Sequence, residues 1–177
     1  MKNFFYLLLC VGLFTFASCN DDDDDEPSLT EANIEGTWNL DRYDNDYTID
    51  ITGTDAVNGS SEISNSNVTM TFTSSSLTWT STGDFTLTLT DSDSTTTENI
   101  TGGIGSGTYS VENGNLVLVG IDSGDETDSD APTVFRPTSY NPDSELKADG
   151  DIDVTIMDPL FGLTVSIDGD IKMELSR

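Results

Sequence analysis

The chain has 177 residues, of which 33 are acidic, six are basic and none is histidine, so its formal net charge is −27 at pH 7. A charge of this sign and size repels nucleic acid and anionic lipid surfaces, which excludes a nucleic-acid partner. The absence of histidine excludes Ser-His-Asp and Cys-His catalysis and imidazole-ligated metal sites. We therefore expect a protein that is not an enzyme and that carries no cofactor.

The first 18 residues are predicted to be a signal peptide. Lys2 supplies a positive start, and the apolar stretch from Phe4 to Phe16 is too short to span a bilayer but typical of a secretory signal. Small residues then precede Cys19, a pattern that resembles the lipobox of bacterial lipoproteins. The resemblance implies that the chain is cut before Cys19, that the Cys19 thiol is acylated, and that the protein meets the membrane through this lipid anchor.

Residues 19–29 are predicted to form a disordered tether behind the lipidated cysteine. Six adjacent acids repel one another and cannot pack, which favours an extended chain; they are Asp21, Asp22, Asp23, Asp24, Asp25 and Glu26. The run resembles the export signal of Bacteroidetes surface lipoproteins, which implies an outer-membrane protein that faces the cell exterior. A solvated spacer in the periplasm is the alternative.

Residues 30–177 show the period-two alternation of β-strands, and no long helical pattern. Asp168-Gly169 predicts a tight hairpin between two of the runs, and the short links elsewhere predict antiparallel neighbours. The alternating runs are residues 36–43, 68–73, 77–80, 85–90, 107–111, 152–156, 163–167 and 171–175. Residues 116–121 are almost continuously apolar, which predicts a strand covered on both faces. Residues 48–65 and 120–147 show no clear pattern, apart from one edge strand around residues 134–136.

The predicted fold is an all-β, antiparallel up-and-down meander of about eight to ten strands that closes into a barrel, because an open meander would leave two unpaired edges. Ile34 to Leu40 with its Gly-x-Trp, and the later hairpin from Gly107 to Leu118, resemble lipocalin-like domains. The resemblance implies a barrel with an internal cavity, with Trp38 packed at its closed end. A basic side chain from a late strand often stacks on this Trp in the family, and Lys172 is the nearest candidate.

Two further sets of residues are candidates for function. The aromatic side chains Phe72, Trp79 and Phe85 could line a cavity for a small apolar ligand, although such residues are also ordinary core. The acidic cluster Asp122, Asp125, Glu126, Asp128 and Asp130 is a weak calcium candidate, since it lacks the EF-hand loop pattern and equally fits a solvated loop. Three Thr-x-Thr-x-Thr triplets, within residues 69–73, 78–82 and 86–90, predict exposed strand faces, with an ice-binding surface as the remote alternative.

The sequence leaves two functions open. The first is a lipid-anchored, lipocalin-like lipoprotein of the outer membrane that is non-catalytic and binds a small apolar ligand. The alternative is a structural or interaction module with an envelope protein as partner, built on a filled barrel or a β-sandwich with no small-molecule ligand.

Overall fold

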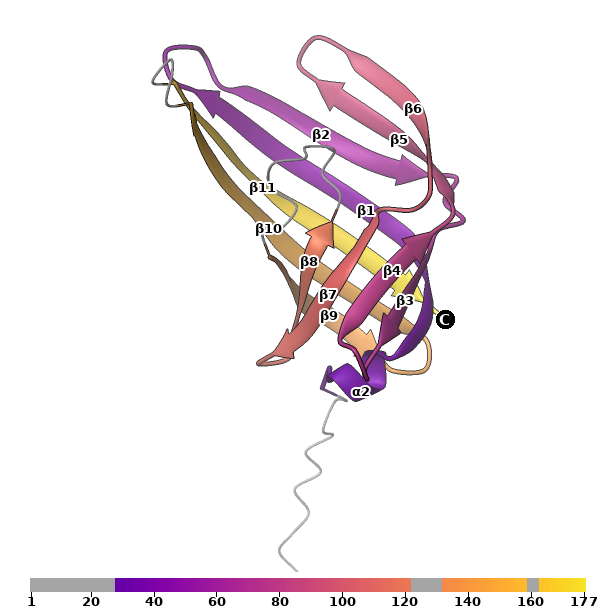
Figure 1. Ribbon diagram of the computed structural model, residues 1–177. Coiled ribbons are helices and arrows are strands. Elements are labelled where there is room, and N and C mark those ends of the chain that lie inside the picture. Colours follow the sequence, from indigo (N-terminus) through magenta and orange to yellow (C-terminus); the bar gives the residue numbers. More distant parts are fainter. Residues whose placement is uncertain (1–27, 122–131, 159–162) are drawn as a thin grey trace, which may run out of the picture.

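A computed structural model describes residues 28–121, 132–158 and 163–177 (Figure 1). The elements are α2 (Glu31–Ile34), β1 (Gly36–Ile51), β2 (Val57–Ser64), β3 (Thr69–Thr73), β4 (Thr78–Thr82), β5 (Asp84–Asp91), β6 (Thr95–Thr101), β7 (Gly105–Glu112), β8 (Asn115–Ile121), β9 (Thr133–Asn141), β10 (Glu145–Asp158) and β11 (Leu163–Ser176). The predicted all-β, antiparallel barrel is confirmed.

Eight strands close the barrel, in the order β1-β3-β4-β7-β8-β9-β10-β11, and β11 pairs back onto β1. The closing β1–β11 pair runs from Asn39 to Ile51 on β1, almost the whole length of that strand. Closure satisfies the edge groups that an open sheet would expose.

The remaining strands, β2, β5 and β6, branch from the barrel along β1. Residues Gly36–Asn39 of β1 pair with β3, whereas Asp44–Ile49 of the same strand pair with β2. Strand β5 then pairs with β2, and β6 with β5. A register shift between Leu40 and Arg42 lies where β1 changes partner. Figure 1 shows that the branch lies toward the end of the barrel opposite α2.

The core fills the half of the barrel nearest α2. Inward residues of the barrel strands pack there, as the alternation predicts. The largest fully buried side chains are Trp38, Trp79, Phe72, Phe135, Ile34, Leu40, Met70, Leu116, Leu118, Leu146, Met173 and Leu175.

The hairpin predicted at Asp168-Gly169 is wrong, because β11 runs through this dipeptide without a turn. Gly169 pairs with Tyr47 on one side and with Ile152 on the other. A Cβ at this position would overlap the carbonyl oxygen of Asp46. The glycine therefore permits a close approach of β1 and β11, which is the other common reason for glycine within a strand.

Two polar strands escaped the sequence pattern, and a third was predicted at the wrong place in the sheet. Strands β2 and β6 are rich in Ser, Thr and Asn, and β9 contains Pro137. The predicted edge strand around residues 134–136 is in fact an interior strand, since β9 pairs with both β8 and β10. Pro137 is tolerated there because it lies beside a register shift in the β9–β10 pair.

The threonine triplets form two surfaces instead of one. Those of β3 and β4 lie opposite each other, and the Oγ1 atoms of Thr69 and Thr82 are 3.3 Å apart. The third triplet lies on β5, which pairs with β2 and β6 and not with β4. The three triplets therefore do not build the single flat array that an ice-binding surface requires.

Candidate ligand-binding face

One end of the barrel is closed by α2 and Trp38. The helix begins with a capping box in which the Thr30 side chain accepts from the Asn33 amide and the Asn33 side chain accepts from the Thr30 amide. The Trp38 Nε1 donates to the Ile34 carbonyl oxygen at 2.7 Å, and the Trp38 ring is fully buried. The indole thus ties the end of the helix to the base of the barrel.

The basic side chain that stacks on Trp38 is that of Arg177. The prediction that Lys172 has this role is therefore wrong. The Arg177 guanidinium carbon lies 4.1 Å from the centre of the Trp38 ring, and Nη2 donates to the Glu35 carbonyl oxygen at 2.6 Å. Lys172 lies between the inward residues Ile171 and Met173, so alternation turns it to the outer face of β11.

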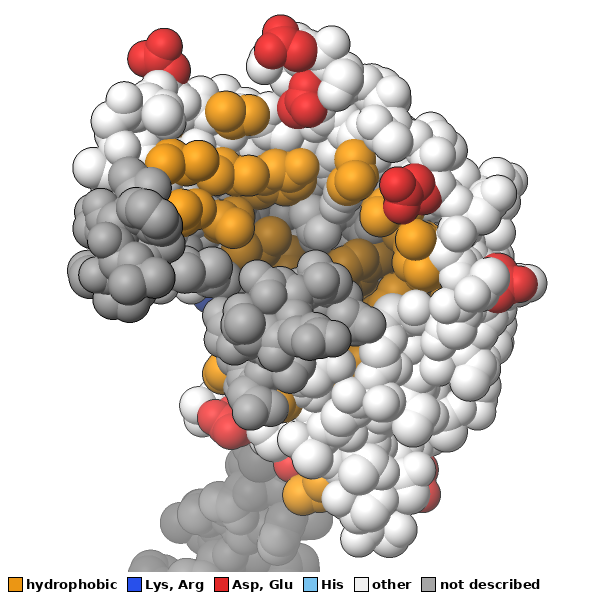
Figure 2. Space-filling model, turned by 45° about the horizontal axis from the view of Figure 1, so that its top comes forward, with side chains coloured by type: hydrophobic (Ala, Val, Ile, Leu, Met, Phe, Trp, Pro, Cys, Tyr) orange, Lys and Arg blue, Asp and Glu red, His pale blue; other side chains and the backbone are white. Residues whose placement is uncertain are grey.

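The opposite end is wide because its strands differ in length. Strand β1 has 16 residues and β10 and β11 have 14 each, whereas β7 has 8 and β8 has 7. The long strands extend past the short ones and, with β2, β5 and β6, form a concave inner face that we call the trough. Figure 2 shows this hollow lined by hydrophobic side chains, with acidic side chains around its margin.

The register of the strands identifies the side chains of the trough. Ile49 of β1 lies opposite Ile167 of β11 and Val57 of β2, so all three face inward together. The other members with a described side chain are Tyr47, Ile51, Leu87, Leu89, Ile100, Ile152 and Val165. Val57 is 41% exposed and Leu89 is 38% exposed, whereas the core residues are at most 8% exposed.

Two glycines let aromatic rings lie flat on the sheet. A Cβ at Gly59 would come within 2.6 Å of the Tyr47 ring, and a Cβ at Gly150 would come within 3.2 Å of the Phe135 ring. Because glycine leaves these positions empty, both rings pack onto a neighbouring strand. Tyr47 thereby becomes part of the floor of the trough.

A polar pair lies between the core and the trough. The Asn45 Nδ2 donates to the Ser61 Oγ at 3.0 Å across the β1–β2 pair. The Asn45 Oδ1 is buried and has no hydrogen-bond partner within the described structure. The other inward residues of β1, β2 and β11 beyond this pair, which form the floor of the trough, are apolar or glycine.

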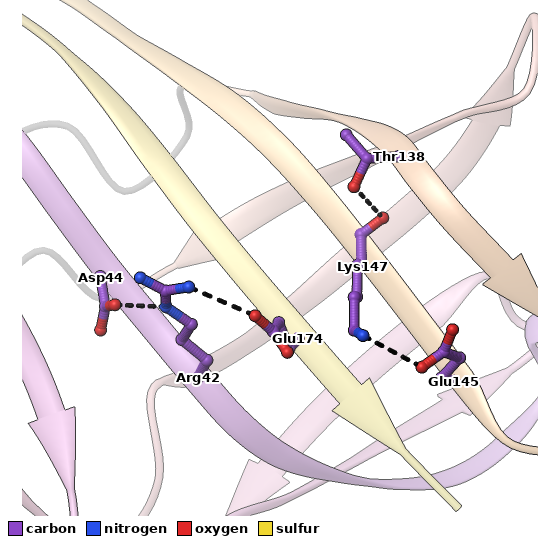
Figure 3. A network of polar contacts seen from close by, with 6 residues as sticks. All are labelled: Arg42, Asp44, Thr138, Glu145, Lys147 and Glu174. Carbon is purple, nitrogen blue, oxygen red and sulfur yellow. Dashed lines mark hydrogen bonds and ion pairs between the residues drawn. The ribbon is translucent and has the colours of Figure 1, made fainter.

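Basic groups are held away from the trough. Arg42 pairs with Asp44 and with Glu174 on the outer face of β1 and β11 (Figure 3). Lys147 pairs with Glu145 at 3.2 Å on β10.

Acidic residues also lie close together on the outer face of β1, β10 and β11. Asp46, Asp170 and Asp151 stand side by side on β1, β11 and β10. Arg136 of β9 pairs with Asp151, and the Arg136 guanidinium holds the pKa of that carboxyl below its usual range. The outer face of the long strands is therefore strongly charged, while their inner face is apolar.

The predicted cavity residues lie deeper than the trough floor. Phe72 packs edge-on against Tyr109, with ring centres 5.2 Å apart. The Trp79 Nε1 donates to the Val119 carbonyl oxygen at 3.0 Å. Phe85 lies opposite Ile100, next to the trough. All three predicted residues belong to the hydrophobic core, and their contact with a ligand stays a prediction.

Several candidate residues lie outside the described residues. They are Cys19, the acidic run Asp21 to Glu26, and the calcium candidates Asp122, Asp125, Glu126, Asp128 and Asp130. Within the described ranges, no group of three or more acidic, Cys or His side chains could hold a metal ion. Within the described residues, no helix combines the length and the apolar character needed to cross a membrane.

Tyr43 gives the domain a pH dependence. The Tyr43 ring lies 6.5 Å from the Phe135 ring, and burial raises the pKa of Tyr43 from 10.0 to about 12. The unfolded chain loses the phenol proton near pH 10 and the folded chain only near pH 12, so stability is complete below this window and falls as pH rises through it.

Between these two pKa values the free energy of unfolding of the wild-type protein is expected to fall by roughly 2 kcal/mol because of Tyr43. The Tyr43→Phe variant has no phenol at this position, so we expect this part of the fall to be absent from it. Urea titrations at several alkaline pH values measure the slope. A residual slope remains in the variant, because burial also raises the pKa of Tyr109 and of Tyr140. An identical slope in both proteins would contradict the assignment to Tyr43.

Comparison with models of known families, with curated protein sequences and with solved structures finds no match to this chain. The candidate site therefore rests on its geometry: a packed, closed barrel end and an open, apolar trough.

Proposed function

We propose that the protein is a non-catalytic, lipid-anchored lipoprotein of the outer membrane that holds a small apolar molecule in the trough. One observation carries this proposal: the inner face of the long strands keeps half-exposed aliphatic and aromatic side chains where the core ends. Contiguous exposed apolar surface is costly in water and usually marks a place where something binds. A concave apolar surface with few polar groups is the common form of a small-molecule site.

The position of the first described residue fits this proposal. The carbonyl oxygen of Ser28, the first described residue, accepts a hydrogen bond from the Asn33 side chain of α2, so the described chain begins at the closed end of the barrel. A tether of residues 19–27 spans up to about 30 Å when extended. An acyl anchor on Cys19 would therefore be attached at the closed end, opposite the trough, and leave the trough accessible.

A specific observation favours the second function, a structural or interaction module. The half of the barrel near α2 is filled by Trp38, Trp79, Phe72 and Phe135, so this half resembles a solid scaffold. In that case the trough would contact an envelope protein in place of a small molecule.

Binding of a neutral apolar dye, Nile red, tests the first function. We expect Ile49→Gln/Ile167→Gln to weaken dye binding by about tenfold or more, because both changes put amide groups against an apolar ligand. The matched control is Thr48→Gln/Ser166→Gln, which alters the same two strands on their opposite face. Fluorescence titration measures affinity, and the urea midpoint confirms that each variant is folded.

Two results would count against a small-molecule site. One is failure of the wild-type protein to bind the dye. The other is an equal loss of affinity in both double variants, which would show that the dye does not bind in the trough.

A further inference from the structure

We infer that the ligand of the trough is an elongated, uncharged apolar molecule, and that the trough rejects acyl anions such as fatty acids. This inference rests on the proposed function and adds the chemical class of the ligand. It is carried by the placement of charge around the trough and by the length of its floor.

No described basic residue reaches the trough. All basic residues except Lys2, which lies in the predicted signal peptide, fall in the described part of the chain. Three of them form the ion pairs on the outer faces of the barrel, Lys172 faces outward on β11, and Arg177 covers Trp38 at the closed end. A carboxylate ligand would find no cationic partner there, and leaving an anion unpaired against apolar groups is costly.

The surrounding field adds to this cost. The net charge of the chain is −27, and acidic side chains stand at the margin of the hollow (Figure 2). Glu98 of β6 is one of the inward residues, since it lies opposite Leu87. Like charges repel an approaching anion and lower its local concentration.

A cation fits the trough floor no better. The inward positions of β1, β11 and β2 beyond the core are all uncharged: Asn45, Tyr47, Ile49, Ile51, Val57, Gly59, Ser61, Val165, Ile167 and Gly169. Asp91 lies opposite Gly59 at the far end of β5, where its exposed carboxylate accepts hydrogen bonds from the amides of Asp93 and Ser94. An ammonium group held at these positions of β1, β2 and β11 would lose its hydration without a carboxylate beside it on the same strands, since Glu98 and Asp91 lie on β6 and β5.

The shape of the floor favours a long molecule. Beyond the Asn45–Ser61 pair, strand β1 contributes the inward side chains of Tyr47, Ile49 and Ile51 in one row. At about 3.3 Å per residue this row is roughly 13 Å long. Its apolar side chains can contact a flexible or flat hydrocarbon along its length, and the open end leaves room for a hydroxyl group in water.

Displacement of Nile red by three molecules of equal chain length tests the inference. The competitors are 1-decanol, decanoate and decylammonium at neutral pH. The Ile49→Gln/Ile167→Gln variant is the blank, because it measures the dye and competitor that partition into detergent and do not bind in the trough. We expect 1-decanol to bind the purified full-length protein at least about tenfold more tightly than either ion. Equal or tighter binding of decanoate or of decylammonium would overturn the inference.

The outcomes separate the inference from the proposed function. If Nile red binds and none of the three competitors displaces it, the inference fails and the proposed function stands. If Nile red does not bind at all, both fail.

A gain of function gives a second, independent test. Ile49→Lys places an ammonium group in the trough, and we expect it to raise the affinity for decanoate by about tenfold or more. Thr48→Lys adds the same charge on the outer face and is expected to leave the affinity for decanoate nearly unchanged. Equal gains in both variants would show that the trough itself does not discriminate between charges, and would overturn the inference.

Discussion

Trp38→Ala is expected to lower the free energy of unfolding by roughly 3–5 kcal/mol, the usual cost of emptying the space of a buried aromatic ring. The Trp38 side chain is fully buried and its Nε1 hydrogen bond holds the carbonyl oxygen of Ile34. The loss is a large part of the stability of an ordinary domain. Urea denaturation of wild type and variant measures it, and a loss below about 1 kcal/mol would contradict the role of Trp38 in closing the barrel.

Two milder substitutions separate the contributions at this end. Trp38→Phe keeps an aromatic ring but leaves the Ile34 carbonyl without its donor, so we expect an intermediate loss. Arg177→Ala removes the cation over the ring and is expected to cost about 1 kcal/mol, whereas Lys172→Ala on the outer face serves as the matched control. If Lys172→Ala costs more than Arg177→Ala, the assignment of the stacking residue is wrong.

Cys19→Ala is expected to move nearly all of the protein from the membrane fraction to the soluble fraction. Acyl chains contribute about 0.8 kcal/mol for each buried methylene, so their loss removes the proposed anchor completely. Cell fractionation followed by immunoblotting measures the change. Cys10→Ala is the matched control, because Cys10 lies in the predicted signal peptide and should not affect anchoring. Unchanged sedimentation of the Cys19→Ala protein with membranes would refute lipidation at this residue.

The acidic run can be tested separately from the anchor. Replacement of Asp21 to Glu26 by Asn and Gln should leave the protein on the membrane but remove its exposure on the cell exterior. Protease treatment of intact cells measures exposure. Continued exposure would show that the run is a spacer and not an export signal.

Much of the barrel could be predicted from the sequence, because inward and outward residues alternate clearly where one face is buried. The row Val68, Met70 and Phe72 is an example, since all three are buried and are separated by threonine. The prediction failed where one residue type serves two different structural roles. Asp-Gly is a strong turn signal, but Gly169 serves the close approach of two strands, and only the partner strand reveals this.

The trough was missed for a different reason. Tyr43, Asn45, Tyr47, Ile49 and Ile51 alternate with Asp and Thr, which is a strand pattern. The polar segment that follows hid this continuation, and the strand was expected to end at residue 43. The search for a cavity therefore fell on Phe72 and Trp79, whose size and aromaticity also suit the core where they lie. Arg177 could not be identified either, because contact with Trp38 depends on closure of the barrel.

Strand β1 pairs with one set of strands in the core and with another in the trough, so the folding of the trough is coupled to the folding of the core. The first residues of this strand bond to β3 in the packed half, and its later residues carry the trough floor. Loss of the barrel would therefore abolish the ligand surface in the same cooperative transition. By mass action, a ligand present at a hundred times its dissociation constant would raise the free energy of unfolding of the whole domain by about 2.7 kcal/mol. A rise in the melting temperature would therefore show that the trough holds a ligand.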